Sequence, residues 1–418
     1  MLIIYWKLSN LLRKMKLITH NTGYKYIYFV FTTLFIVLLS LFTQGCADEP
    51  TSLGIQFVPP SETTGVKVFD SYVDSIDVTY SSVKRFINTS NSFDLIVGQS
   101  GTYNSKGLIK FNGISSDYDS ATVTSAVLKL RYRNYYYPVT FEDSLGQIGF
   151  DVYTVSQNIS YSAVTLDSIN TNSFGNIPQG TYTGSPTADS QEINIDLSTS
   201  LVKDWLEYAA DTNYSAKNYG IVLSPNSSSN VLKGFYSGKV ETDLKPSLQI
   251  IVTKNNDTDT LVLNTTETVF LANGDIPIVP GVFFLQGGIN YIELFKFVTN
   301  AVPSTATIND AQLILTIDQD NSLISPQTQR KVIGLSAIDS GALNTEGEFS
   351  ALELNGKYSM RMIYPFQKWI QGGANYGLLV VPSNRFLNLD LFAFHNIDSP
   401  DPNKRPRIII RYSPRVIP

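Results

Sequence analysis

Cys and His are scarce in this chain of 418 residues, and no spacing singles out a catalytic pair among its 36 Asp and Glu residues. There is one Cys, Cys46, and the two His residues are His20 and His395. A single thiol can form neither a thiolate zinc site nor an intrachain disulfide. A lone His is more often structural than catalytic, and the acidic string at 318–321 lacks the Gly and the distal Glu of a calcium loop. Because there is also no glycine-rich phosphate loop and no serine nucleophile elbow, we predict a protein that is not an enzyme and holds no metal or cofactor.

A run of cations and aromatic rings is the strongest candidate for a ligand-binding surface. Its members lie on one predicted strand and its continuation: Arg131, Arg133, Tyr135, Tyr136 and Tyr137. Leu128, Leu130 and Tyr132 alternate with the cations, so the cations should point away from the core. Exposed rings attract the C–H groups of sugars, and Arg pairs with uronic carboxylates. We therefore expect these residues to bind an anionic or neutral polysaccharide, and the alternative is that the rings pack against a neighbouring domain.

The strand that carries these residues has a counterpart later in the chain. Matching segments occur in the same order, with 108–111 matching 293–297, 121–130 matching 306–315, 218–223 matching 375–380 and 245–252 matching 405–412. Trp205 and Trp369 each belong to a short helix that precedes an Asn-Tyr-Gly turn. Period-two alternation with one apolar face is typical of half-buried antiparallel strands. The sequence thus predicts two versions of one β-rich domain, with both Trp side chains in the cores. The second copy lacks the cations and rings and has Thr316, Asp318 and Asp320 at the corresponding stretch.

The predicted domains leave short polar segments between and after them. The first domain is expected at 66–254 and the second at 260–413. An Asn/Asp/Thr run at 255–259 reads as a linker, and 414–418 reads as a tail. Net charge is -5, and no long basic stripe occurs, so nucleic acid is not an expected partner.

The first residues resemble a bacterial lipoprotein signal. Basic residues precede an uncharged apolar run from Ile27 to Phe42, and Cys46 follows Gly45 where that run ends. The resemblance implies a signal peptide at 1–45, lipidation of Cys46, and a Pro/Gly-containing tether at 46–65. We therefore expect a lipid-anchored protein of the cell envelope, exposed at the surface of an outer membrane.

The repeated segments resemble the DNRLRE family of bacterial extracellular modules. The matching motifs are Lys110-Phe111 and Lys296-Phe297, Ala126 to Leu130 and Ala311 to Leu315, the two Trp-bearing helices, the two Asn-Tyr-Gly turns, and Pro246 to Ile250 and Pro406 to Ile410. The name-giving Asp-Asn-Arg-Leu-Arg-Glu string is absent. The resemblance implies an all-β chain with two tandem antiparallel β-sandwich domains, jelly-roll-like, each with one short Trp-bearing helix. Some relatives bind polysaccharides, so the expected function is non-catalytic binding of polysaccharide or another extracellular polymer. The alternative is a structural or adhesion lipoprotein that spaces or assembles other surface components.

Overall fold

The computed structural model describes residues 65–414, apart from 75–77, 242, 266 and 299. The predicted signal peptide, Cys46, and the predicted tether up to residue 64 lie outside these described residues. Within the described range, no helix has both the length and the apolar character needed to cross a bilayer. The all-β prediction is confirmed, because the described residues form two curled antiparallel sheets of 11 strands each.

The first sheet contains the segment that carries the predicted ligand-binding residues. Its spatial order is β12 (Asp257–Asn264), β11 (Ser247–Lys254), β5 (Thr122–Tyr137), β10 (Leu232–Tyr236), β3 (Asp94–Ser100), β4 (Tyr103–Lys110), β9 (Ile221–Pro225), β6 (Ile148–Thr154) and β7 (Gly180–Gly184), with β13 (Glu267–Asn273) on β4 and β8 (Glu192–Asp196) on β5. The long strand β5 produces the curl: its first part pairs with β11 and its last part with β10. We call this sheet and its helix α4 (Thr199–Ala210) the first lobe.

The second sheet repeats the first nearly strand for strand. Its spatial order is β1 (Lys67–Asp70), β22 (Arg407–Ser413), β16 (Thr307–Thr316), β19 (Lys357–Arg361), β18 (Thr345–Leu354), β17 (Lys331–Ala337), β20 (Leu378–Pro382), β15 (Tyr291–Phe297), β14 (Val282–Gln286) and β21 (Leu391–His395), with β2 (Val78–Lys84) on β15. With α5 (Ile363–Ile370) it forms the second lobe. The remaining short helices are α3 (Phe141–Ser144), η2 (Ser116–Tyr118), η3 (Leu166–Ser168), η4 (Thr171–Ser173) and η5 (Pro402–Lys404).

The two Trp-bearing helices occupy equivalent positions in the two lobes. Helix α4 packs on β5 and α5 packs on β16, and β5 and β16 have matching sequences. Trp205 and Trp369 are only 2% and 4% exposed, and each lies in the apolar core of its own lobe. The prediction that both are core residues is confirmed. A helix of this length is marginal alone, so the packing of its apolar face stabilises it.

The Asn-Tyr-Gly turn after each helix is built in the same way in both lobes. Asn218 Nδ2 donates to the carbonyl of Phe111 at 3.0 Å, and Asn375 Nδ2 donates to the carbonyl of Phe297 at 2.7 Å. The two glycines that follow have φ of +101° and +104°, a region that L side chains rarely adopt. A Cβ on Gly220 would also lie 2.5 Å from a backbone carbonyl oxygen of β4. The motif is therefore a structural turn that ties the helix to the next strand.

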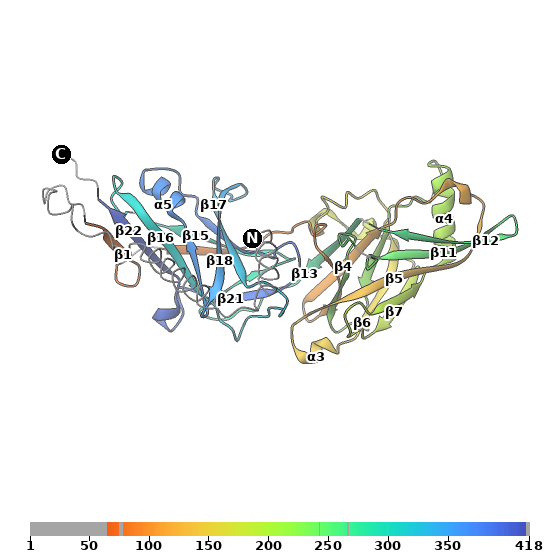
Figure 1. Cartoon of the computed structure of the whole chain (residues 1–418), viewed down its shortest axis with the longest axis horizontal. Helices are drawn as coiled ribbons and strands as arrows, with labels where there is room; N and C mark the ends of the chain where they lie inside the picture. Colours follow the sequence, from red (N-terminus) through yellow and green to blue (C-terminus); the bar gives the residue numbers. More distant parts are fainter. Residues whose placement is uncertain (1–64, 75–77, 242, 266, 299, 415–418) are drawn as a thin grey trace, which may run out of the picture. The chain divides into compact units, whose positions relative to one another are not determined.

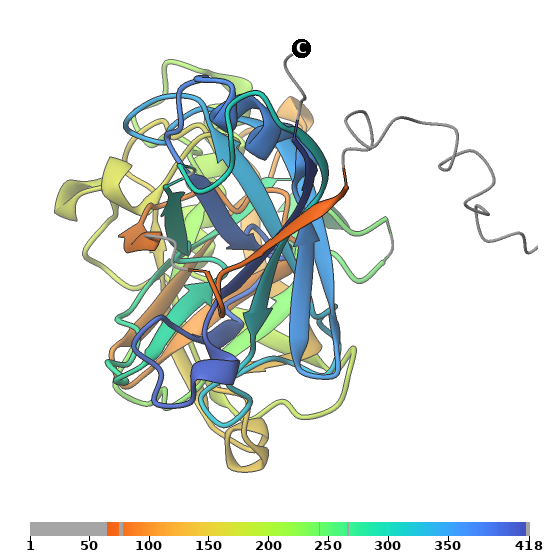
Figure 2. The ribbon, with the colours of Figure 1, turned by 90° about the vertical axis from the view of Figure 1, so that its left-hand side faces the viewer.

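Two pairs of strands belong to the other sheet than the predicted domain boundaries imply: β1 and β2 at the start of the described chain, and β12 and β13 in its middle. β1 and β2 lie in the predicted first domain but pair with β22 and β15 of the second sheet. In Figures 1 and 2 the orange β1 accordingly lies among the blue strands, and green β13 lies beside orange β4 in Figure 1. The predicted linker at 255–259 is instead a hairpin turn at Asn255 and Asn256, with φ of 53° and 69°, followed by the start of β12.

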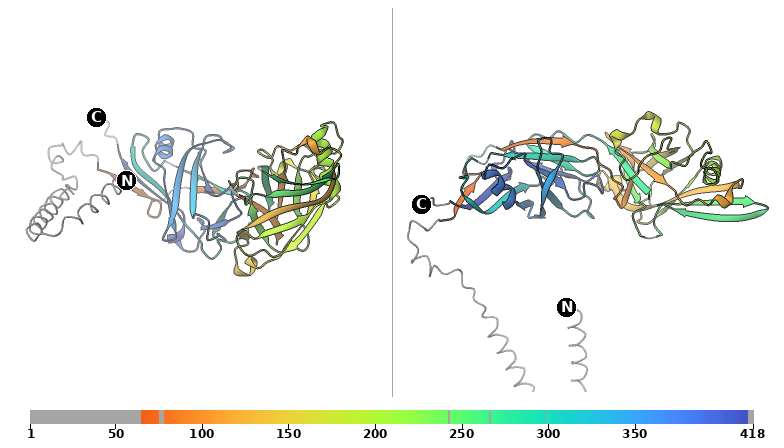
Figure 3. Two further views of the ribbon diagram at one scale, coloured as in Figure 1. Left: turned by 45° about the vertical axis from the view of Figure 1, so that its right-hand side comes forward. Right: turned by 90° about the horizontal axis from the view of Figure 1, so that it is seen from above.

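These departures have one physical cause. Alternation in a sequence reports which face of a strand is buried, but it does not specify the neighbouring strand with which the backbone pairs. A polar Asn-Asn segment is compatible with a linker and with a tight hairpin, because Asn tolerates positive φ. Whether the two lobes fold independently of one another stays a prediction. Figure 3 lets the reader follow the exchanged orange and green strands in two further views.

Candidate functional site

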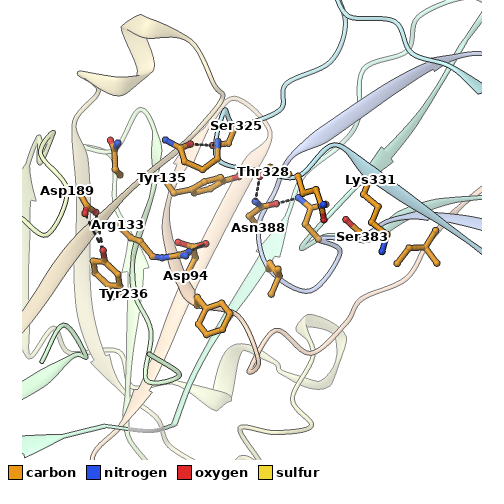
Figure 4. Close-up of a pocket in the computed structure, with 17 residues that line it drawn as sticks. Asp94, Arg133, Tyr135, Asp189, Tyr236, Ser325, Thr328, Lys331, Ser383 and Asn388 are labelled. Carbon is orange, nitrogen blue, oxygen red and sulfur yellow. Dashed lines mark hydrogen bonds and ion pairs between the residues drawn. The ribbon is translucent and has the colours of Figure 1, made fainter. Parts of the chain in front are cut away.

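A cavity with a volume of about 670 Å³ lies where the two lobes meet. The first lobe contributes residues from β3, β5, β10 and the segment between β7 and β8, and the second contributes the start of β17 and the segments that precede β17 and follow β20. Figure 4 shows side chains from both lobes converging on this cleft. The lining residues are Phe93, Asp94, Arg133, Asn134, Tyr135, Asp189, Tyr236, Ser325, Gln327, Thr328, Gln329, Lys331, Ile333, Ser383, Asn384, Leu387 and Asn388. Amides, hydroxyls, aromatic rings and two cations therefore face one space.

Arg133 is the central cation on the first-lobe side. Its Nη1 lies 2.6 Å from Asp94 Oδ2, and its guanidinium carbon lies 5.8 Å from the ring centroids of both Phe93 and Tyr236. Two aromatic rings and a carboxylate thus hold a planar donor group in one orientation. Its side chain keeps 35% of its surface exposed, so the guanidinium remains accessible from the cleft.

The carboxylate beneath Arg133 is almost fully buried. Burial raises the pKa of Asp94 to about 6, although the nearby Arg133 guanidinium acts in the opposite direction. Its Oδ1 has no hydrogen-bond partner among the described residues. On the rim, the Tyr236 hydroxyl lies 3.2 and 3.3 Å from the two carboxylate oxygens of Asp189. The first lobe therefore presents an ordered row of a ring, a guanidinium and a second ring, supported from below by one acid.

The described residues on the second-lobe side of the cleft include no acid and are rich in amides. Asn388 Nδ2 donates to Thr328 Oγ1 at 2.9 Å, and Asn384 Nδ2 donates to Asn388 Oδ1. Gln327 on the rim is exposed. Lys331, at the start of β17, adds one cation. Side-chain amides and hydroxyls both donate and accept hydrogen bonds, so this face is suited to a ligand that carries hydroxyl groups.

Tyr135 fastens the two lobes together at the floor of the cleft. Its hydroxyl donates to Asp390 Oδ1 at 3.2 Å and accepts the backbone N–H of Leu389 at 2.9 Å. Burial raises the pKa of Asp390 to about 6. Asp390 is fully buried behind Tyr135 and does not line the cavity. Its carboxylate therefore binds the Tyr135 hydroxyl and is not available to a ligand in the cleft.

The structure brings only part of the predicted ligand-binding run to the cleft. Arg133 lies in it and Tyr135 forms its floor, whereas Arg131 pairs with Glu192 at 2.6 Å outside it. Tyr137 is fully buried and accepts a hydrogen bond from Gln286 Nε2 of the second lobe at 3.1 Å. The half-buried Tyr136 does not line the cleft. The expectation of three exposed rings was wrong for Tyr135 and Tyr137, and contact with the neighbouring domain, the stated alternative, is what the structure shows.

Cover by the second lobe, and not a change of face at the β-bulge in β5, explains the burial of Tyr135 and Tyr137. Phe235 of β10 pairs with Tyr132, but the adjacent Gly234 pairs with Tyr135, so Arg133 and Asn134 stand opposite no residue. Asn134 has φ of 51° and is exposed. Because two residues are added, the alternation continues unchanged beyond the bulge, and Tyr135 and Tyr137 lie on the same face as Arg133. Alternation from Leu128 therefore predicts their face, but it cannot reveal that the second lobe covers that face.

Several residues of the cleft carried no recognisable signal in the sequence. Phe93, Asp94 and Tyr236 come from two other strands or their ends, and the amides come from loops about 190 to 255 positions further along the chain than Arg133. Among the described residues no group of three or more His, Cys, Asp or Glu is arranged to hold a metal ion. No protein-family model matches this chain, and a search of curated proteins finds no match either.

Proposed function

We propose that this protein is a non-catalytic surface lipoprotein that binds a polysaccharide or a related extracellular polymer in the cleft between its lobes. One observation carries the proposal: Arg133 is held between Phe93 and Tyr236 on one wall of a cavity of about 670 Å³, opposite a wall of amides and hydroxyls. A cavity of that size matches small-molecule and oligosaccharide sites, in which a few polar groups orient the ligand.

The charges of the cleft favour a neutral sugar over an acidic one. Its cations are Arg133 and Lys331, and its acids are Asp94 and Asp189, so they balance as two against two. Arg133 is already paired with Asp94, which reduces its attraction for a uronic carboxylate. A planar guanidinium and side-chain amides can each engage neighbouring hydroxyls of a sugar ring, while the aromatic rings offer surface to its C–H groups. Of the two kinds of polysaccharide that the sequence led us to expect, anionic and neutral, we therefore retain the neutral one.

The proposal includes the finer architecture suggested by the family resemblance. Each curled sheet would be a β-sandwich of jelly-roll-like form, arranged in tandem with the other. Support comes from the core of each lobe, where residues from strands on both ends of the sheet order, such as Leu248 and Phe150, belong to one apolar cluster. Cys46 would carry the lipid that anchors the chain to an outer membrane. Converting Cys46→Ala should move the protein to the soluble fraction, and continued membrane association would contradict the anchor.

Binding can be tested with two variants that change the cleft but not the core. Phe93 is 47% exposed and Gln327 is exposed, so Phe93→Ala and Gln327→Ala should leave the fold intact. Tyr364→Ala is the matched control, because Tyr364 is an aromatic residue, 58% exposed, that does not line the cleft. Affinity electrophoresis against neutral and acidic glycans should show retardation of the wild type that Phe93→Ala reduces about tenfold or more, in line with loss of a ring contact of 1–2 kcal/mol.

The outcomes distinguish the two functions that remain. Retardation that survives both cleft variants would move sugar binding to another surface. No retardation of the wild type by any glycan would favour the structural or adhesion function, in which the lobes space or assemble other surface components.

A further inference from the structure

Each half of the described chain consists of a two-strand arm and a nine-strand body. The N-terminal arm contains β1 and β2, and the central arm contains β12 and β13. The first body runs from β3 to β11 and the second from β14 to β22, with the Trp-bearing helix between the sixth and seventh strands of each. Segments of similar length, residues 85–93 and 274–281, join each arm to the body that follows it.

Each arm completes the body of the other half rather than its own. In the first lobe, β12 pairs with the last strand β11 of the body and β13 pairs with β4. In the second lobe, β1 pairs with the last strand β22 and β2 pairs with β15, the counterparts of β11 and β4. A body is thus completed by the arm that follows it in the chain. No further arm follows the second body within the described residues, and the first strands of the chain fill that position.

The N-terminal arm is held by its backbone ladder, by polar contacts and by a few apolar side chains. Phe69 lies in the core of the second lobe and Val78 and Tyr80 pack against that core, whereas Val68 is 57% exposed. Asp70 receives two hydrogen bonds from Arg407, and the Tyr80 hydroxyl lies 3.0 Å from Asp398 Oδ2. The partners of these two arm residues, Arg407 and Asp398, belong to the second body, so the second body of another molecule would offer the same partners.

One buried carboxylate of the second body makes binding of the N-terminal arm less favourable. Glu293 of β15 is fully buried opposite Ser82 of β2. The Ser82 hydroxyl donates to its Oε2 at 2.7 Å, but its Oε1 has no hydrogen-bond partner among the described residues. A buried carboxylate oxygen without a partner costs free energy. The first lobe has Gly107 at the equivalent position, where a Cβ would lie 2.8 Å from Val97.

We propose that the strands of the N-terminal arm, β1 and β2, are exchangeable, and that the second body accepts β1 and β2 of a second copy of this chain. The arm would make the same contacts with the second body of its own chain and with that of another chain. The equilibrium between the monomer and the exchanged dimer therefore depends on effective concentration and on strain in the connecting segment. Two molecules that exchange arms reciprocally satisfy both second bodies and leave no body incomplete. The proposal is independent of sugar binding in the cleft.

Cross-linking between two differently labelled chains tests this exchange. Val68 and Arg411 face each other across β1 and β22, and both are exposed. In the full chain with Cys46→Ser, the natural sequence leaves no other thiol, so Val68→Cys and Arg411→Cys provide the only two reactive groups. The two single variants are expressed together, purified, and treated with a short bis-maleimide. We expect a covalent dimer that contains one chain of each kind and that is at least tenfold more abundant than dimers formed by either variant alone.

A chain that carries both substitutions is the positive control, because it should cross-link within itself and confirm the strand register. If that control reacts while the co-expressed single variants give no mixed dimer, the arm does not exchange and the proposal is overturned. Glu293→Gln supplies a second measurement, because an amide of the same shape removes the buried carboxylate. Because the arm should then bind more favourably, mixed dimers that have not been cross-linked should exchange with excess unlabelled protein several-fold more slowly. An unchanged or faster rate would overturn the assigned effect of Glu293.

Discussion

The two lobes share one strand topology but differ in the length of one strand, β5 in the first lobe and β16 in the second. The cleft lies at the longer end of β5. In the first lobe β5 continues for 16 residues, passes through the bulge at Asn134, and delivers Arg133 and Tyr135 to the second lobe. In the second lobe the matching strand β16 stops after 10 residues, and Asp318 accepts backbone N–H groups in the turn that follows. The two lobes thus share the core and the helix, whereas the longer end of β5 gives the first lobe a surface that the second lobe lacks.

The cores of the two lobes are expected to respond alike to loss of the Trp. Trp205→Ala and Trp369→Ala should each lower the free energy of unfolding by about 3–5 kcal/mol, because each removes a large side chain from a closed apolar cluster. Denaturant unfolding followed by fluorescence and circular dichroism measures both. A cost below about 1 kcal/mol for either variant would show that its helix packs less tightly than its counterpart.

A buried acid distinguishes the lobes in their response to pH. Burial raises the pKa of Glu293 to about 7 from 4.5, and the first lobe has Gly107 instead. The pKa of this carboxyl is higher in the folded than in the unfolded protein. Its contribution to stability is therefore fully present below about pH 4.5 and is lost as the pH rises through about 7. The loss amounts to about 3 kcal/mol at most.

Glu293→Gln should therefore reduce the fall in stability between pH 5 and pH 8. Part of the fall will remain, because the pKa values of Asp94 and Asp390 are raised to about 6 by burial and change stability in the same direction. Thermal melts of wild type and variant across this range give the slopes. Parallel slopes for the two proteins would show that Glu293 is not buried in its charged form.

The Asn-Tyr-Gly turns should prove energetically equivalent. Asn218→Ala and Asn375→Ala each remove one hydrogen bond to a strand carbonyl and one from the backbone N–H of the glycine. We expect each to cost about 1–3 kcal/mol, because a partly buried carbonyl loses its partner. Equilibrium unfolding compares the two directly, and a difference above about 2 kcal/mol would separate the roles of the turns.

The smallest expected effect concerns the bulge that the second lobe lacks. Asn134 holds a positive φ, which Gly adopts without steric cost, so Asn134→Gly should change stability by less than about 1 kcal/mol. Asn134→Val should cost more, because a β-branched residue is disfavoured at positive φ. Equal stability of the Gly and Val variants would mean that the bulge relaxes into a regular strand.

Local pattern in the sequence determined much of this protein. Alternation over Leu128 to Tyr132 identified a half-buried strand, and the repeated order of segments identified two matching halves. The burial of both Trp side chains and the role of the Asn-Tyr-Gly turns also followed from the sequence, because neighbouring residues on one helix face or in one turn act over a few positions.

Only the tertiary structure decided where the arms dock and which side chains meet in the cleft. β1 pairs with a strand more than 300 residues away, and nothing in an edge strand specifies its partner, because backbone hydrogen bonds are the same for every sequence. Tyr135 and Tyr137 lie on the face that alternation predicts, but the second lobe covers that face. The cleft itself exists because loops of the second lobe fold against Arg133, and contacts between segments so far apart depend on the packing of both lobes rather than on spacing in the chain.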